Sequence, residues 1–109
     1  MKILVNRTIL YYIDKYPSAA KSLQAWVGEF STLDALNFNQ IKAIYGNASI
    51  VANNRVVFNI KGNDFRLVIS VNFIQKASYV IWFGTHSEYD KINVATVAYD
   101  KKINDFKSK

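Results

Sequence analysis

The sequence has no cysteine, and it has one histidine and one proline among its 109 residues. The absence of cysteine excludes disulfides, thiolate metal sites and a cysteine nucleophile. Because His86 is the sole histidine, a site built from several histidines is impossible within one chain. We therefore expect neither a metal nor a cofactor.

Several familiar motifs and all long apolar runs are also missing. There is no phosphate-binding loop, dinucleotide fingerprint or nucleophile elbow. The apolar stretch at 3–5 is far too short for a signal peptide or a membrane-spanning helix. These absences predict a cytoplasmic protein with no membrane partner.

What the chain does have is positive charge and enough apolar content for a core. It carries 14 basic and 8 acidic residues, a net charge of +6, and 50% of its residues are hydrophobic. Such a charge favours polyanionic partners such as nucleic acid. The length and hydrophobic content predict one compact domain over residues 1–109.

The N-terminal half has the periodicity of helices. After a short strand at 3–5, Asn6 is placed to cap a helix that runs to Tyr16, and Pro17 suits the first turn of the next helix. A third short helix is expected before Gly46, which can terminate it. The second helix has an apolar stripe at steps of three and four residues: Ala20, Leu23, Trp26, Val27 and Phe30.

The middle of the chain predicts a β-hairpin. Segments 55–60 and 65–74 alternate at period two, and residues 61–64 read as a tight turn. A two-residue loop at Gly62-Asn63 would place Asn59 opposite Arg66. One hairpin face is then wholly apolar, and we expect it to form the core under the helices: Val56, Phe58, Ile60, Phe65, Leu67, Ile69, Val71 and Phe73.

The opposite hairpin face is mixed and carries three basic side chains: Arg55, Lys61 and Arg66. A third strand is expected at 79–85, followed by a helical turn capped by Ser87, and the basic tail from about residue 100 is expected to be solvated and frayed. The predicted class is α+β, with N-terminal helices on one face of a small antiparallel sheet.

Arg66 and His86 are the residues best suited to phosphodiester chemistry. The guanidinium offers a fork of donors that fits phosphate, and an imidazole can transfer a proton near neutral pH. Ordinary alternatives exist, since Arg66 could be a solvated surface residue and His86 a capping residue. If three residues connect the second and third strands, His86 lies opposite Arg66; if two residues do, Thr85 lies there instead.

Two stretches of the sequence are similar to signature stretches of a known family. They are Arg55–Ile69, with a Phe-Asn-x-x-Gly-Asn-x-x-Arg hairpin, and Gly84–Lys91, with Thr-His-x-x-Tyr-Asp. In order and spacing they resemble the HigB family of type II toxins, in the RelE-like superfamily. The helical first half, with its break at Tyr16-Pro17, also resembles that family in layout.

The resemblance implies a toxin that cleaves messenger RNA, commonly on the ribosome, and that a HigA-type helix-turn-helix antitoxin neutralises. It implies catalytic roles for Arg66 as the phosphate ligand, His86 as acid or base, and Tyr89 as a positioning group. Arg55, Asn59, Lys61, Asn63 and Lys91 complete the candidate set as RNA-binding residues. The alternative is a module whose basic sheet face binds RNA or a protein without cutting anything.

Overall fold

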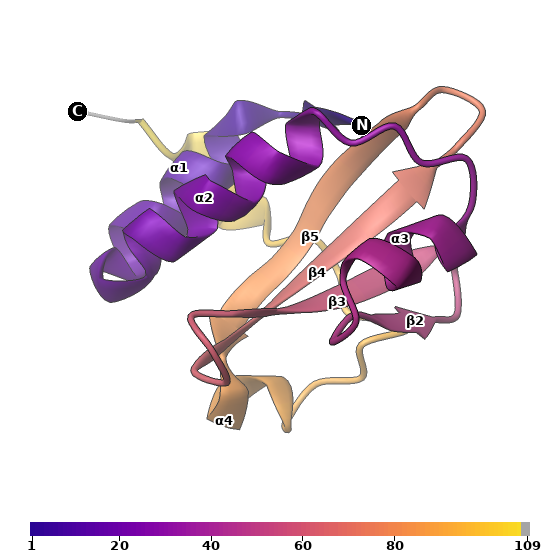
Figure 1. The fold of residues 1–109 in the computed structure, drawn as a ribbon. Coiled ribbons are helices and arrows are strands. Elements are labelled where there is room, and N and C mark those ends of the chain that lie inside the picture. Colours follow the sequence, from indigo (N-terminus) through magenta and orange to yellow (C-terminus); the bar gives the residue numbers. More distant parts are fainter. Residues whose placement is uncertain (108–109) are drawn as a thin grey trace.

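The computed structural model describes residues 1–107, which form helices packed on one five-stranded sheet. The sheet order is β1-β5-β4-β3-β2, and only the β1–β5 pair is parallel (Figure 1). The strands are β1 (Lys2–Leu4), β2 (Ser49–Val51), β3 (Arg55–Ile60), β4 (Phe65–Asn72) and β5 (Ala77–Thr85). The helices are α1 (Asn6–Lys15), α2 (Ala20–Ser31), α3 (Phe38–Ile44) and α4 (His86–Tyr89), with 3₁₀ turns η1 (Pro17–Ala19) and η2 (Lys101–Asp105).

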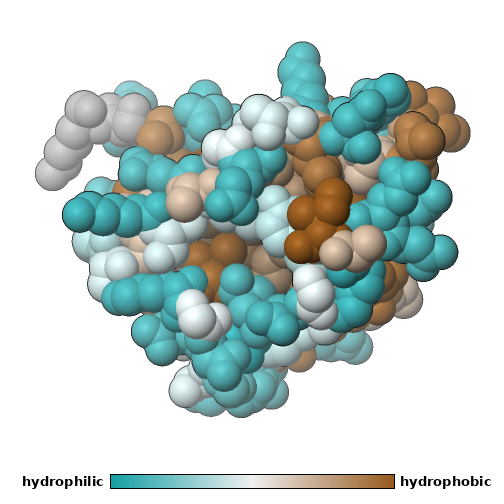
Figure 2. Space-filling view, in the orientation of Figure 1, coloured by the Kyte–Doolittle hydropathy of each residue, from teal (hydrophilic) through white to brown (hydrophobic). Residues whose placement is uncertain are grey.

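The predicted α+β class is confirmed, and α1, α2 and α3 lie on one side of the sheet (Figure 1). Pro17 begins η1 between α1 and α2, where its missing N–H costs no helical hydrogen bond. The predicted cap at Asn6 is wrong, because Asn6 is already helical and Val5 precedes it in the left-handed region with φ 62°. Figure 2 shows this side of the molecule as mostly hydrophilic, with separate apolar areas.

The predicted hairpin register is confirmed, with Asn59 opposite Arg66 and Val57 opposite Val68. The Asp64 amide closes the turn by donating to the Lys61 carbonyl at 3.2 Å. The apolar face is the core, as expected: Val56, Phe58, Ile60, Phe65, Leu67, Ile69 and Val71 are buried, and Phe73 is partly buried against them.

Both predicted registers for the third strand are wrong, because Gly84 lies opposite Arg66. β4 stops at Asn72, and residues 73–76 form a longer turn than either expectation allowed. Farther along, Val68 pairs with Trp82 while Ile69 pairs with Val80, so Ile81 is an extra residue in a bulge. The turn and the bulge together set which β5 residue meets Arg66.

The C-terminal part of the chain crosses the sheet face that the helices leave open (Figure 1). Arg55 anchors this segment, because its Nη1 donates to the carbonyls of Val94 and Val97 at 2.8 Å each. On the same face, Val57 and Val68 are 3% and 0% exposed. The face that the sequence predicts to be an open mixed surface is therefore partly covered.

The expected frayed tail is also not what the structure shows for residues 100–106. η2 packs beside α1, and its Ile103 is 0% exposed. The Tyr11 hydroxyl donates to Asp100 Oδ2 at 3.1 Å, and the Tyr11 ring meets the edge of Phe106. One buried isoleucine and these aromatic contacts explain why a lysine-rich segment docks here. Ser108 and Lys109 lie outside the described residues.

Candidate active site

Arg66 is half-buried on the sheet face opposite the helices and is fixed by the β3–β4 turn. Its Nη1 donates to the carbonyls of Asn63 and Phe65 at 3.0 and 3.1 Å, and its Nη2 donates to Asn63 Oδ1 at 3.4 Å. Asn59, opposite it on β3, donates from Nδ2 to the same Asn63 oxygen at 3.4 Å. The turn thus sets the direction of the guanidinium before any ligand arrives.

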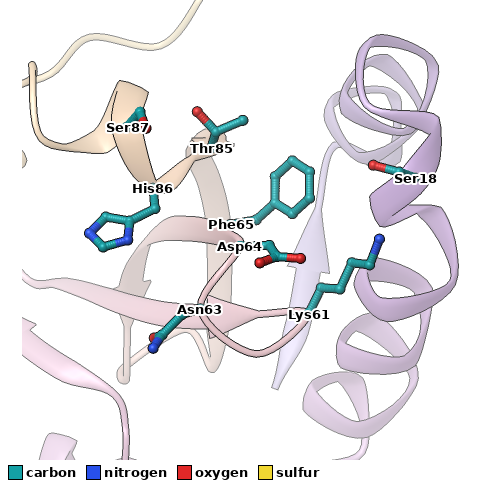
Figure 3. Close-up of a pocket in the computed structure, with 8 residues that line it drawn as sticks. All are labelled: Ser18, Lys61, Asn63, Asp64, Phe65, Thr85, His86 and Ser87. Atoms are coloured by element: carbon teal, nitrogen blue, oxygen red, sulfur yellow. The ribbon is translucent and has the colours of Figure 1, made fainter.

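The turn itself needs glycine and moves Lys61 away from Arg66. Gly62 has φ 64° and Lys61 has φ 55°, so both lie in the left-handed region. This interrupts the alternation of the strand, and Figure 3 shows Lys61 extending toward Ser18 while His86 and Asn63 extend to the other side. The expectation that Lys61 shares a face with Arg66 is therefore wrong.

His86 begins α4 directly after β5 and stands at the same end of the sheet as Arg66. The His86 amide donates to the Asp64 carbonyl at 2.9 Å, which continues the β4–β5 pairing one step beyond Thr85. Its Nε2 lies 3.5 Å from Asp90 Oδ2, one helical turn later, and its side chain is 52% exposed. One imidazole nitrogen thus faces a carboxylate, and the ring is open to solvent.

The cap of α4 is Thr85 rather than the predicted Ser87. Thr85 Oγ1 accepts from the Glu88 amide at 3.1 Å, and Glu88 Oε1 accepts from the Thr85 amide at 2.9 Å, which makes a capping box. Because the helix starts two residues earlier than expected, His86 lies within it.

Tyr89 and Trp82 form an aromatic pair beside this site. Their ring centroids are 6.2 Å apart at an interplanar angle of 52°, and both side chains are partly exposed. Trp82 shares the sheet face with Arg66, because Arg66 and Gly84 pair two residues away from the Val68–Trp82 pair. Such a pair offers a surface on which a nucleotide base can stack.

The structure gathers some of the predicted residues and separates others. Arg66, Asn59, Asn63 and His86 meet around the turn and the start of α4, with Tyr89 at the end of that helix. Arg55 lies at the opposite end of β3, and exposed Lys91 follows α4.

Next to the turn is an open hollow (Figure 3). It lies between η1, the turn and α4, and its lining residues are Ser18, Lys61, Asn63, Asp64, Phe65, Thr85, His86 and Ser87. The hollow therefore joins both sides of the turn, with Lys61 on one side and His86 on the other.

Three residues of the site were not predicted from the sequence: Trp82, Gly84 and Asp90. A Cβ at Gly84 would lie 2.7 Å from a Trp82 ring carbon, so the indole needs a glycine there. Asp90 follows His86 by one helical turn, a spacing that the sequence does contain. Trp82 could have been found only with the correct β5 register.

Residues 19–92 match the family HigB_toxin, which is described as the RelE-like toxic component of a toxin-antitoxin system. The chain belongs to the HigB toxin family. No curated protein matches it. Family membership makes the chain the toxin of a toxin–antitoxin pair, with an antitoxin as its partner.

The family match includes every candidate residue of this HigB-family toxin, from Arg55 to Lys91. It stops at residue 92, before the segment that Arg55 anchors, and it starts after α1 and β1. Among residues 1–107, no three His, Asp or Glu side chains are grouped as a metal site requires. No helix in that range is long and apolar enough to cross a membrane.

Proposed function

We propose that this HigB-family toxin is an endoribonuclease that cuts mRNA without a metal ion. The observation that carries the proposal is the placement of Arg66 and the sole histidine at one end of the sheet. Arg66 pairs with Gly84, and the His86 amide binds the Asp64 carbonyl. A sheet arginine and an imidazole at the same end of the sheet suit one phosphodiester between them.

The reaction is attack of a 2′-hydroxyl on the adjacent phosphorus. The oxygen–phosphorus bond that forms closes a 2′,3′-cyclic phosphate, and the bond to the 5′-oxygen of the next nucleotide breaks. One proton leaves the 2′-hydroxyl and one is given to the departing 5′-oxygen. The protein must therefore orient the hydroxyl, stabilise charge on the phosphate and move protons.

Arg66 would bind the scissile phosphate. Its guanidinium is already directed by Asn63 and Phe65, so little orientational freedom is lost when a phosphate binds. A planar fork also binds two phosphate oxygens at once, which a lysine ammonium does not do in the same way.

His86 would transfer one of the two protons. Asp90 lies near Nε2, which leaves Nδ1 available to the substrate. Tyr89, together with Trp82, would position the neighbouring base by stacking.

The remaining polar residues would hold the RNA on either side of the cut. Asn59 and Asn63 lie next to Arg66, Lys61 lies across the turn, and Lys91 follows α4. Phosphate contacts of this kind fix the register of the RNA and depend on charge more than on exact position. Arg55 lies at the opposite end of β3 from the turn, where its Nη1 donates to two carbonyls of the C-terminal segment, and we assign it to anchoring that segment.

The biological setting that we propose is the cytoplasm, with mRNA on the translating ribosome as substrate and a HigA-type helix-turn-helix protein as antitoxin. Expression in bacteria, with and without the neighbouring antitoxin gene, tests this setting. We expect growth arrest from the toxin alone and recovery with the antitoxin.

Purified toxin should then be incubated with mRNA, both free and in a translation reaction. We expect new 5′-hydroxyl ends matched by cyclic phosphates. Growth arrest without any cleavage in either reaction would favour the alternative, a basic binding module that blocks translation without cutting RNA.

A further inference from the structure

α4 is too short to be stable by itself, so its direction depends on contacts outside it. A single helical turn is unfavourable in water because nucleation fixes several residues for few hydrogen bonds. The capping box between Thr85 and Glu88 closes the turn but joins only neighbouring residues. It cannot fix how the turn is directed relative to the sheet.

The His86 amide holds the start of the turn at the Asp64 carbonyl, and a second long-range hydrogen bond fixes the direction of the rest of the turn. The Tyr16 hydroxyl donates to Glu88 Oε1 at 2.7 Å, the same oxygen that accepts from the Thr85 amide. Tyr16 is itself held by the core, where its ring meets the edges of Phe65 and Phe83 at centroid distances of 5.6 and 5.8 Å. The Glu88 carboxylate therefore ties α4 to the end of α1.

The charge states of both partners favour this bond. Desolvation, followed by the hydrogen bond to Glu88, raises the pKa of Tyr16, so its hydroxyl stays protonated and keeps its donor. Desolvation acts to raise the pKa of Glu88, but hydrogen bonds from Thr85 and Tyr16 outweigh it and the pKa is lowered. A phenol donating to a carboxylate is a charge-assisted bond and stronger than a neutral one.

Gly84 provides the space for this arrangement. A Cβ at Gly84 would lie 3.1 Å from Glu88 Oε1 and 2.7 and 2.8 Å from two ring carbons of Trp82. The carboxylate and the indole thus converge over the residue that pairs with Arg66. A side chain there would displace one of them.

We propose that Glu88 and Tyr16 are positioning residues, which hold α4 so that His86 faces the phosphate site at Arg66. His86 is the first residue of α4 and its amide is held by the Asp64 carbonyl, so a rotation of the turn about that point redirects the imidazole. The part of the proposal that concerns the phosphate rests on the proposed function, whereas the anchoring of α4 does not. A misplacement of about 1 Å is enough to reduce a rate about a hundredfold.

The kinetic test compares Tyr16→Phe, Glu88→Ala and Glu88→Gln with the control Tyr45→Phe. Tyr45 is another partly buried core tyrosine, and its ring packs on Phe30 and Phe58. We expect kcat for RNA cleavage to fall about tenfold in Tyr16→Phe and about thirty- to a hundredfold in Glu88→Ala, with KM changed less than about threefold. Glu88→Gln keeps an acceptor oxygen and should stay within about threefold of wild type, as should Tyr45→Phe.

The NMR signal of the imidazole gives a second readout, independent of cleavage. Because His86 is the chain's one histidine, its ring signal needs no assignment. The signal should move in Tyr16→Phe and Glu88→Ala and stay in place in Glu88→Gln and Tyr45→Phe. If Glu88→Ala does not fold, Tyr16→Phe still tests the positioning role, because it removes only the hydroxyl and keeps the aromatic ring in the core.

The two readouts distinguish a failure of the positioning role from a failure of the proposed function. A wild-type imidazole signal and a wild-type kcat in folded Tyr16→Phe would overturn the positioning role. Shifted imidazole signals in a chain that cuts no RNA would overturn the proposed function and leave the anchoring of α4 standing.

Discussion

Arg55 and Arg66 lie on the same sheet face, yet the structure predicts a much larger loss of stability when Arg55 is replaced by alanine. Arg55 is half-buried, and its Nη1 donates two hydrogen bonds of 2.8 Å to carbonyls of the C-terminal segment. A hydrogen bond from a charged group contributes about 1.5–3 kcal/mol, and two bonds from one nitrogen add less than twice that. We expect Arg55→Ala to lower the free energy of unfolding by about 2–4 kcal/mol.

Urea unfolding measures this difference directly. With a slope near 2 kcal/mol per molar, the midpoint for Arg55→Ala should fall by about 1–2 M. Arg66→Ala is the matched control, because its hydrogen bonds reach only the adjacent turn residues Asn63 and Phe65 and two of the three are exposed to solvent. It should lose less than about 1 kcal/mol. Equal midpoints for the two variants would refute the assignment of Arg55 as an anchor.

Three further changes test other parts of the fold. Leu67→Ala should lower the free energy of unfolding in urea by about 2–5 kcal/mol, since Leu67 is 0% exposed. Ile74→Ala, at a position 97% exposed, should change it by less than about 0.5 kcal/mol. Similar losses in both variants would show that the core is elsewhere. Gly84→Ala should lower the free energy of unfolding by about 1–3 kcal/mol through overpacking, because the new methyl group meets Trp82 and Glu88. It should also move the His86 NMR signal. An unchanged melt and spectrum would contradict the close approach of Trp82 and Glu88 to Gly84. The lowered pKa of Glu88 means that its contribution to stability is complete above the ordinary value of 4.5 and is lost as the pH falls through the lower folded value. The melting temperatures of wild type and Glu88→Gln should therefore differ at neutral pH and converge in acid. A difference independent of pH would contradict a stabilising role for the Glu88 carboxylate.

The hairpin and its core face were predictable because one strong local rule governs them. Alternation on both strands, joined by a turn with a glycine, leaves a single register that buries the whole apolar set. The helices followed from apolar spacing and from Pro17 in the same way. The family resemblance added the roles of Arg66, His86 and Tyr89, which the pattern alone left open.

The features that were missed depend on contacts between distant segments or on small shifts in the backbone. β2 is too short to show alternation, although Asn53 and Asn54, at φ 64° and 60°, mark the turn that joins it to β3. The β5 register depends on the bulge at Ile81, which no local pattern indicates. The anchoring roles of Arg55 and Glu88 require partners 39 and 72 positions away, so sequence spacing could not identify them.

The central claim is that Arg66 and His86 act on the same phosphate, and RNA cleavage by point variants tests it most directly. Arg66→Ala, Arg66→Lys and His86→Ala should be assayed on free mRNA and in a translation reaction, with circular dichroism to confirm that each is folded. Loss of a positioned charge donor typically lowers a rate about a hundred- to a thousandfold, and loss of a general acid or base about a hundred- to ten-thousandfold. We expect all three variants to fall by at least about a hundredfold, Arg66→Lys included, because an ammonium does not reproduce the fork. Wild-type cleavage by folded Arg66→Ala or folded His86→Ala would contradict the account.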